Sequence, residues 1–162
     1  MSKPVKLLSF VVVCACVLLA INFGMRASFG FFMEPISSHF GYGREVFAFA
    51  LALQNLCWGL FAPAAGAVAD RFGTTKTIYV GTVAYALGLY VTATAEGFWG
   101  LNIGAGVLVG MGIAGTGFGV ILPALARMVS EEKRGLALGL GTAAGSFGQL
   151  LVIPLAQEFI AG

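Results

Sequence analysis

The sequence has little charge and few of the polar residues that cover a water-exposed surface. Only 10% of its 162 residues are Asp, Glu, Lys or Arg, whereas soluble domains carry about 25%. Hydrophobic residues make up 59% of the chain, and the mean hydropathy is +0.94. The net charge of +2, without a basic run, gives no sign of a nucleic-acid partner. We therefore expect an integral membrane protein whose surroundings are the lipid bilayer.

The residue types that carry enzyme chemistry are scarce as well. The chain has one histidine, His39, which we expect at the surface of an outer loop, and its three cysteines lie in apolar runs without metal-ligand spacing. The sequence contains no Ser/His/Asp arrangement and no paired carboxylates inside an apolar run. It also lacks a Gly-rich loop followed by Lys and Ser or Thr, which ATP-driven transport needs. We predict no enzyme activity, no metal and no cofactor.

Five apolar stretches are long enough to cross a bilayer. About 20 helical residues span the 30 Å hydrocarbon layer, whereas barrel strands need only about 9–11 alternating residues. The sequence therefore predicts an all-α, polytopic transmembrane helix bundle that forms a single domain over residues 1–162. Pro123 permits a kink near the end of the fourth helix. The expected helices cover about residues 5–33, 45–69, 77–95, 100–129 and 135–160.

The N-terminus has two interpretations. Lys3 and Lys6, followed by an apolar run, resemble the start of a cleaved signal peptide. The run continues past Ala20 to Met33, which is too long for such a peptide and favours a spanning helix. With the N-terminus inside, the inner segments hold seven Lys or Arg residues and the outer loops hold only Arg44. We therefore expect a cytoplasmic N-terminus.

Arg26 falls inside the first expected span. An Arg at the centre of a span costs at least about 2.5–3.5 kcal/mol on insertion scales, so it seldom faces lipid. Asn22 lies one turn earlier on the same helical face. Because the guanidinium fork matches a carboxylate, we predict that Arg26 faces a watery central cavity and meets an anionic substrate or a partner carboxylate. The alternative places Arg26 near the outer interface, snorkelling or paired with Glu34.

Amide side chains occur in two other expected spans. Gln54 and Trp58 share one face of the second helix. Such groups line a polar cavity or bond neighbouring helices, and the second role is worth about 0.6 kcal/mol on average. Both interpretations remain open for these residues. The candidate substrate-binding residues are Arg26, Asn22, Gln54, Asn55, Trp58 and Gln149.

The strongest local pattern lies between the second and third expected helices. Residues 66–76 read Gly-Ala-Val-Ala-Asp-Arg-Phe-Gly-Thr-Thr-Lys. This stretch resembles motif A of the major facilitator superfamily, although Thr74 and Thr75 stand where basic residues are common. The matching positions, which form the candidate gating motif, are Gly66, Asp70, Arg71, Gly73 and Lys76.

Other stretches agree with this resemblance. Residues 132–139 and 145–149 resemble parts of the family's fifth helix, and residues 26–32 resemble the first helix of the bacterial monocarboxylate and oxalate/formate porter branch. The Arg that the family often carries in its fourth helix is absent from residues 105–115, which puts proton coupling through that Arg in doubt. The resemblance covers about helices one to five.

The resemblance implies alternating access, in which two six-helix halves rock around a site near the membrane midplane. It also implies that Asp70 meets the positive N-terminal end of a helix in the other half. Asp70 would then latch the inner gate while the outer side is open, and Arg71 would position the loop. The simpler interpretation is a solvated turn in which Asp70 caps a helix.

The sequence therefore predicts a fragment of a secondary transporter, a symporter or antiporter that moves a small organic anion such as a monocarboxylate. Five spans lack the sixth helix and the second half, so the expected partner is the missing C-terminal half of the transporter. The expected location is the bacterial inner (plasma) membrane. The alternative is a structural membrane subunit that assembles with partner helices and does not itself transport.

Overall fold

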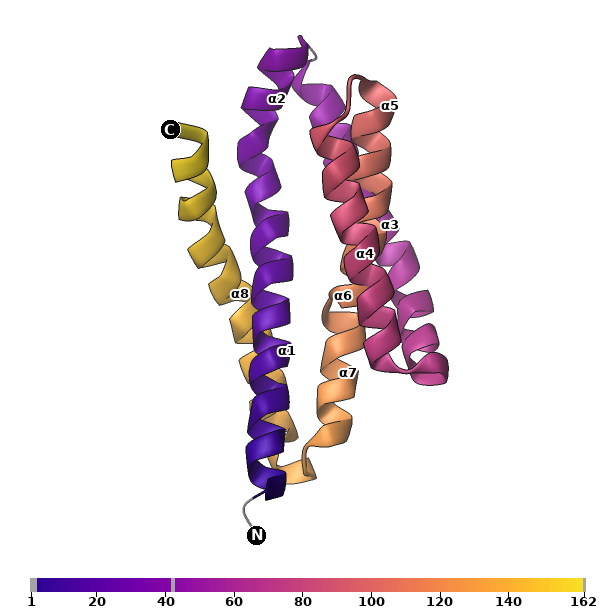
Figure 1. Ribbon diagram of the computed structural model, residues 1–162, viewed down its shortest axis with the longest axis vertical. Helices are drawn as coiled ribbons and strands as arrows, with labels where there is room; N and C mark the ends of the chain where they lie inside the picture. Colours follow the sequence, from indigo (N-terminus) through magenta and orange to yellow (C-terminus); the bar gives the residue numbers. More distant parts are fainter. Residues whose placement is uncertain (1–2, 42, 162) are drawn as a thin grey trace. The chain divides into compact units, whose positions relative to one another are not determined.

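The computed structural model describes the backbone of residues 3–41 and 43–161, and it leaves the side chains of residues 3–9, 33, 36, 39, 40, 160 and 161 undescribed. Every regular element in these ranges is helical (Figure 1). The chain divides into two compact units, Met1–Ser28 with Ile121–Gly162 and Phe29–Val120. The expectation of an all-α fold is confirmed.

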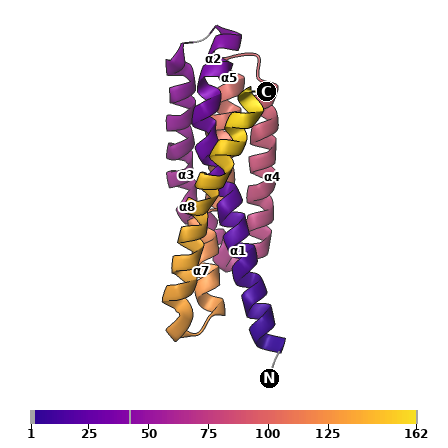
Figure 2. The ribbon, with the colours of Figure 1, turned by 90° about the vertical axis from the view of Figure 1, so that its left-hand side faces the viewer.

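The first unit is built on the contact between the helices nearest the two ends of the chain. Helix α1 (Lys3–Ser28) crosses α8 (Glu131–Ala161) at close range (Figures 1 and 2). A Cβ atom added at Gly148 would overlap the backbone of Ala20, and one added at Gly24 would lie 2.7 Å from the carbonyl oxygen of Gly148. In lipid, such close approach of small residues is a main source of helix–helix attraction. Gly148 thus fixes how closely α1 and α8 pack.

The charged segment before α8 forms a short connection. Helix α7 (Phe118–Met128) ends near Ser130, whose carbonyl oxygen accepts a hydrogen bond from the N–H of Lys133 at 2.9 Å. Arg134 reaches back and donates from Nε to the carbonyl oxygen of Ala126 at 3.0 Å. Glu131 and Glu132 lie in the first turn of α8, where the helix dipole favours negative charge. These contacts turn the chain sharply between two apolar helices.

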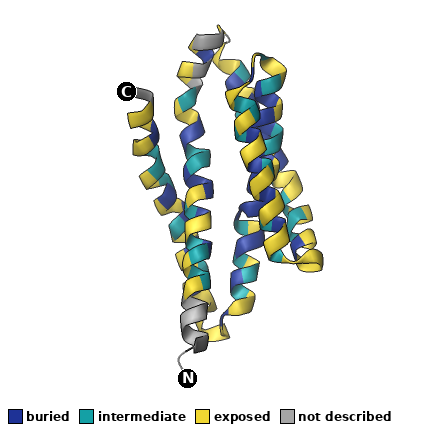
Figure 3. Ribbon diagram, viewed as in Figure 1, coloured by how far each residue is buried: buried dark blue, intermediate teal, exposed yellow. Residues whose placement is uncertain are grey.

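The second unit packs two long helices around a buried segment. The long helices are α3 (Arg44–Phe72) and α4 (Thr74–Ala93), and the buried segment is α5 (Phe98–Leu101), η2 (Asn102–Leu108) and α6 (Val109–Thr116). Most residues of η2 and α6 are buried (Figure 3). Glycines again allow close contact, because a Cβ atom at Gly112 would lie 2.7 Å from Cα of Tyr85. The core of this unit therefore lies where α6 meets α4.

The first expected helix, residues 5–33, ends earlier than predicted. α1 stops at Ser28, and a 3-10 turn, η1 (Phe29–Phe32), leads into α2 (Met33–Phe40), most of which lies outside the expected helix ranges. Pro35 permits α2 because a proline in the first turn sacrifices no helical hydrogen bond. His39, expected in a loop, lies in this helix, and its side chain is outside the described part.

The fourth expected helix, residues 100–129, is interrupted at a different place from the predicted kink. The break lies at Gly117, whose backbone is extended (φ −94°, ψ −167°), whereas Pro123 lies inside α7. Seven residues of this segment, Asn102–Leu108, are π-helical. The helix is therefore interrupted at the glycine and continues through the proline.

Four of the five expected spans meet the length and hydropathy of a membrane-crossing helix. They are Phe10–Phe32, Arg44–Phe72, Phe98–Met128 and Glu131–Phe159. The third expected span corresponds to α4, whose 20 residues are about 30 Å long. Lys76 together with threonines and tyrosines lowers the hydropathy of α4, so its role as a fifth span stays a prediction.

Candidate functional site

Arg26 lies near the C-terminal end of α1, inside the span Phe10–Phe32. Its side chain is half-buried, and Asn22, one turn earlier, is only 5% exposed. Six residues separate Arg26 from the end of the span, which places it about 9 Å inside that end. The negative end of a helix dipole favours a cation in the last turn. Arg26 is thus a partly covered cation inside a candidate membrane span.

Gln149 belongs to the same unit as Arg26 and Asn22. It is half-buried and follows Gly148, the residue whose backbone meets Ala20 of α1. The first unit therefore gathers three of the predicted binding residues on two adjoining helices.

Gln54 is buried in the second unit and joins two helices. Its side chain is 1% exposed, and its Nε2 donates a hydrogen bond of 2.8 Å to the carbonyl oxygen of Ala105. Ala105 lies in the π-helical segment η2, and a backbone carbonyl has two lone pairs, so it accepts this extra bond. The geometry matches the helix-bonding interpretation of Gln54. Its role in binding substrate stays a prediction.

We expect Gln54→Leu to lower the free energy of unfolding by about 1 kcal/mol, because intramembrane hydrogen bonds between helices are worth about 0.6–1.7 kcal/mol. Unfolding of the purified protein in mixed micelles would measure this loss. Asn55→Leu is the matched control, since Asn55 is exposed and its Nδ2 donates within its own helix, to the carbonyl oxygen of Leu51 at 2.8 Å. Unchanged stability of the Gln54 variant, with weakened substrate binding, would instead favour the cavity interpretation.

Trp58 lies one turn after Gln54 and is half-buried. A Cβ atom built at Gly117 would lie 3.7 Å from its indole nitrogen, so the ring lies beside the break between α6 and α7. Gln54 and Trp58 therefore both face the buried segment, as their spacing predicts. Asn55, on another face of α3, is exposed.

The candidate gating motif lies at the junction of α3 and α4. Gly66, Asp70 and Arg71 belong to the end of α3, and Lys76 belongs to the first turn of α4. The expected loop is therefore a single residue, Gly73, with φ +101°. This positive φ is a conformation that glycine adopts readily and that other residues rarely do.

Contacts around the junction hold it in place. The N–H of Gly73 donates to the carbonyl oxygen of Ala69 at 3.0 Å, and the carbonyl oxygen of Gly73 accepts from Thr77 N–H at 3.3 Å and Thr77 Oγ1 at 3.2 Å. Asp70 and Arg71 are exposed, and the Arg71 guanidinium lies 5.4 Å from the centre of the Phe72 ring. The side chains of Asp70 and Arg71 thus lie at the surface of this unit, just before the junction.

The predicted set leaves out four buried polar side chains in the described part of the second unit, Ser37, Thr77, Asn102 and Thr116. Asn102 is 3% exposed and donates from Nδ2 to the carbonyl oxygen of Phe98 at 2.7 Å. Thr116 is 6% exposed, bonds the carbonyl oxygen of Gly112 at 2.8 Å and directly precedes Gly117. An amide inside the fourth expected span, at position 102, was the sequence feature that could have identified Asn102. No sequence feature distinguishes Thr116, because threonines that bond to their own helix are common.

Comparison with known proteins gives matches along nearly the whole chain. Residues 15–162 match the Major Facilitator Superfamily. Over 141 residues the chain is 31% identical to monocarboxylate transporter 11 of Mus musculus and 30% identical to that of Homo sapiens, covering 85% of this chain and 30% and 29% of those proteins. It is 29% identical over 126 residues to the Major facilitator superfamily multidrug transporter mfsC of Aspergillus fumigatus, covering 75% of this chain and 23% of that protein. The chain thus spans less than a third of the length of these relatives.

Proposed function

Because the chain belongs to the major facilitator superfamily, we propose that it is the N-terminal portion of a secondary transporter that moves a small organic anion, such as a monocarboxylate, by alternating access. The family match confirms the resemblance of the chain to this superfamily. Membrane-spanning helices and the family together identify an integral membrane protein of a transporter family. The anionic cargo, the site and the gate are the proposed part.

The observation that carries the proposal is the half-buried Arg26 inside the span Phe10–Phe32. A cation at this depth is costly unless it meets an anion or water, so its presence indicates a polar path. Its planar donors suit a carboxylate, and the buried Asn22 one turn earlier adds a hydrogen-bonding group. Two relatives that carry the name monocarboxylate transporter support the same class of cargo. Gln54, Asn55, Trp58 and Gln149 remain the other proposed binding residues.

The exposed Asp70 and Arg71 support the proposed gate. In this proposal the end of α3 that carries Asp70 meets a helix N-terminus in the second half of the transporter, where unbonded N–H groups and the helix dipole stabilise an anion. In our proposal Asp70 makes this contact only while the outer side is open, so that substrate binding competes with it. We also propose α4 as the fifth span and a cytoplasmic N-terminus in a bacterial inner membrane.

Uptake by the full-length gene product in proteoliposomes tests the proposal. We expect uptake of labelled lactate that pyruvate and acetate inhibit by more than half, because they share the carboxylate. Neutral glycerol and cationic ethylamine, which lack it, are expected to inhibit by less than a tenth. Equal inhibition by the neutral analogue would contradict an anion site. A protein that moves none of these solutes, yet copurifies with a partner membrane protein, would favour the structural-subunit alternative.

A further inference from the structure

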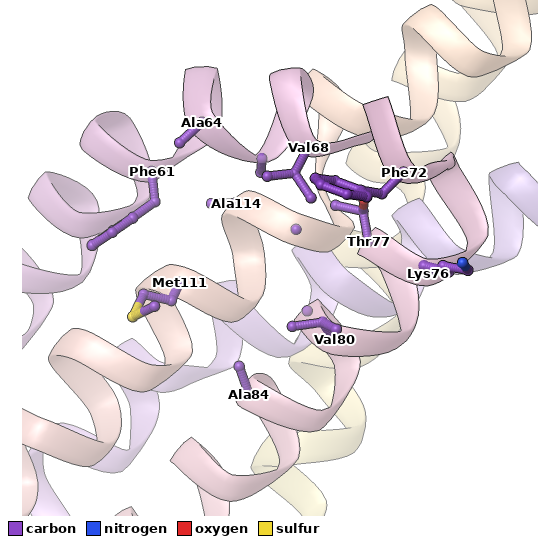
Figure 4. A pocket seen from close by; sticks show the side chains of 13 residues that line it. Phe61, Ala64, Val68, Phe72, Lys76, Thr77, Val80, Ala84, Met111 and Ala114 are labelled. Atoms are coloured by element: carbon purple, nitrogen blue, oxygen red, sulfur yellow. The ribbon is translucent and has the colours of Figure 1, made fainter. Parts of the chain in front are cut away.

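A groove of about 450 Å³ lies on the second unit, between α3, α4 and α6 (Figure 4). Its walls carry large apolar side chains, among them Phe61, Val68 and Phe72 of α3, Val80 of α4 and Met111 of α6. Small residues lie between them: Gly81 and Gly115 both line the groove, and their backbones are in close contact. The groove therefore forms because small residues allow α4 and α6 to pack closely, while the larger side chains form its walls.

Charge is confined to one end of the groove. Lys76 lines that end together with Phe72, whereas Phe61, Met111 and Ala84 lie toward the other end (Figure 4). Arg71, whose guanidinium lies over the Phe72 ring, adds a second exposed cation there, and Asp70 adds one exposed carboxylate. The end is thus net positive, and the remaining lining is almost entirely apolar. This polarity complements a molecule with an anionic head and a hydrocarbon tail.

The length of the groove matches one leaflet of a membrane. Phe61 and Phe72, eleven residues apart in α3, are separated by about 16 Å along the helix axis. One leaflet of the hydrocarbon core is about 15 Å deep. A head group beside Lys76 would therefore lay its chain along the groove toward the middle of the bilayer.

A single hydrocarbon chain in the groove gains dispersion contacts with apolar walls that an empty groove forfeits. Phe61, Val80 and Met111 are all exposed on this surface, so a chain in the membrane reaches them directly.

We propose that this groove binds one acyl chain of an anionic phospholipid whose phosphate pairs with Lys76. None of the proposed substrate-binding residues lines this groove, and the assignment does not depend on the transported solute. Because Lys76 and Arg71 belong to the candidate gating motif, a lipid bound here stabilises the end of the groove that adjoins the Gly73 junction.

Native mass spectrometry of the chain, released from nanodiscs of equal phosphatidylglycerol and phosphatidylcholine, tests this site. We expect one retained phosphatidylglycerol, at least threefold more abundant than retained phosphatidylcholine. Lys76→Gln is expected to bring this ratio close to one, and Val80→Trp, which fills the groove, to remove most of both adducts. The matched controls are Lys133→Gln, at the start of α8, and Val83→Trp, an exposed position of α4 outside the groove.

Three results would overturn the proposal. Retention that is equal for both lipids and insensitive to Lys76→Gln would remove the head-group contact. Loss of the adduct in Lys76→Gln without any loss in Val80→Trp would place the lipid on the surface cations and outside the groove. Ala84→Leu, a smaller filling, replaces Val80→Trp if that variant fails to fold. A photoreactive residue at Met111 that crosslinks to protein rather than lipid in the full-length product would also contradict the assignment.

Discussion

Arg26→Ala in the full-length transporter is expected to lower carboxylate uptake at subsaturating concentration by at least tenfold. A hydrogen bond to a charged group is worth about 1.5–3 kcal/mol, and each 1.4 kcal/mol is about a factor of ten in binding. Arg26→Lys keeps the charge but loses the planar fork, so we expect an intermediate loss. Initial rates of labelled lactate uptake, at protein levels matched by immunoblot, measure both effects.

Arg44→Ala is the matched control for this experiment. Arg44 is an exposed arginine at the start of α3, and its NH2 lies 3.7 Å from an oxygen of the exposed Glu34. Surface ion pairs contribute about 0–1 kcal/mol, so uptake should change by less than twofold. An Arg26→Ala protein with normal uptake and affinity would remove the anion-site claim and leave the family assignment untouched.

Gly148→Leu is expected to abolish the close packing of α1 on α8. The atoms that a side chain would meet belong to the backbone of Ala20, which cannot rotate aside. Overpacking of this kind costs about 1–3 kcal/mol or more, so we expect the free energy of unfolding to fall by at least 2 kcal/mol. The apparent melting temperature of the purified protein, followed by fluorescence-detected size exclusion, measures the loss.

Gly139→Leu on the same helix provides the control for this second prediction. Gly139 is exposed, and a Cβ atom there would meet nothing within 4 Å outside its own helix. Replacing an exposed helical glycine removes backbone freedom from the unfolded chain, so stability should stay unchanged or rise slightly. Equal losses from both substitutions would mean that side-chain size, rather than the α1–α8 contact, determines the effect.

Apolar length alone predicted most of the helices, because a bilayer forces the backbone to satisfy its own hydrogen bonds. It failed where a local rule had an exception. Pro35 lies two residues beyond the expected end of the first helix, yet it occupies the first turn of α2, where proline is tolerated. Pro123 looked like the place for a kink, yet the extended residue is Gly117. Hydropathy predicts neither outcome, because it does not show where a helix begins.

The residues of the candidate site likewise divide into those that the sequence alone predicts and those that need the folded structure. Arg26 and the residues of the gating motif stand out because charge in or beside an apolar run is visible locally. The bond from Gln54 to Ala105 joins residues 51 positions apart, so the sequence left its role open. The groove beside Lys76 needs side chains from three helices. No short stretch of the sequence contains all the residues that form this groove.

The one-residue junction at Gly73 limits how α3 and α4 can move. A peptide chain has two soft torsion angles per residue, so a single connecting residue supplies only one φ and one ψ between two long helices. Thr77 restrains even these by holding the Gly73 carbonyl oxygen. A tilt of α3 must therefore carry the near end of α4 with it, so the two helices cannot tilt independently of one another.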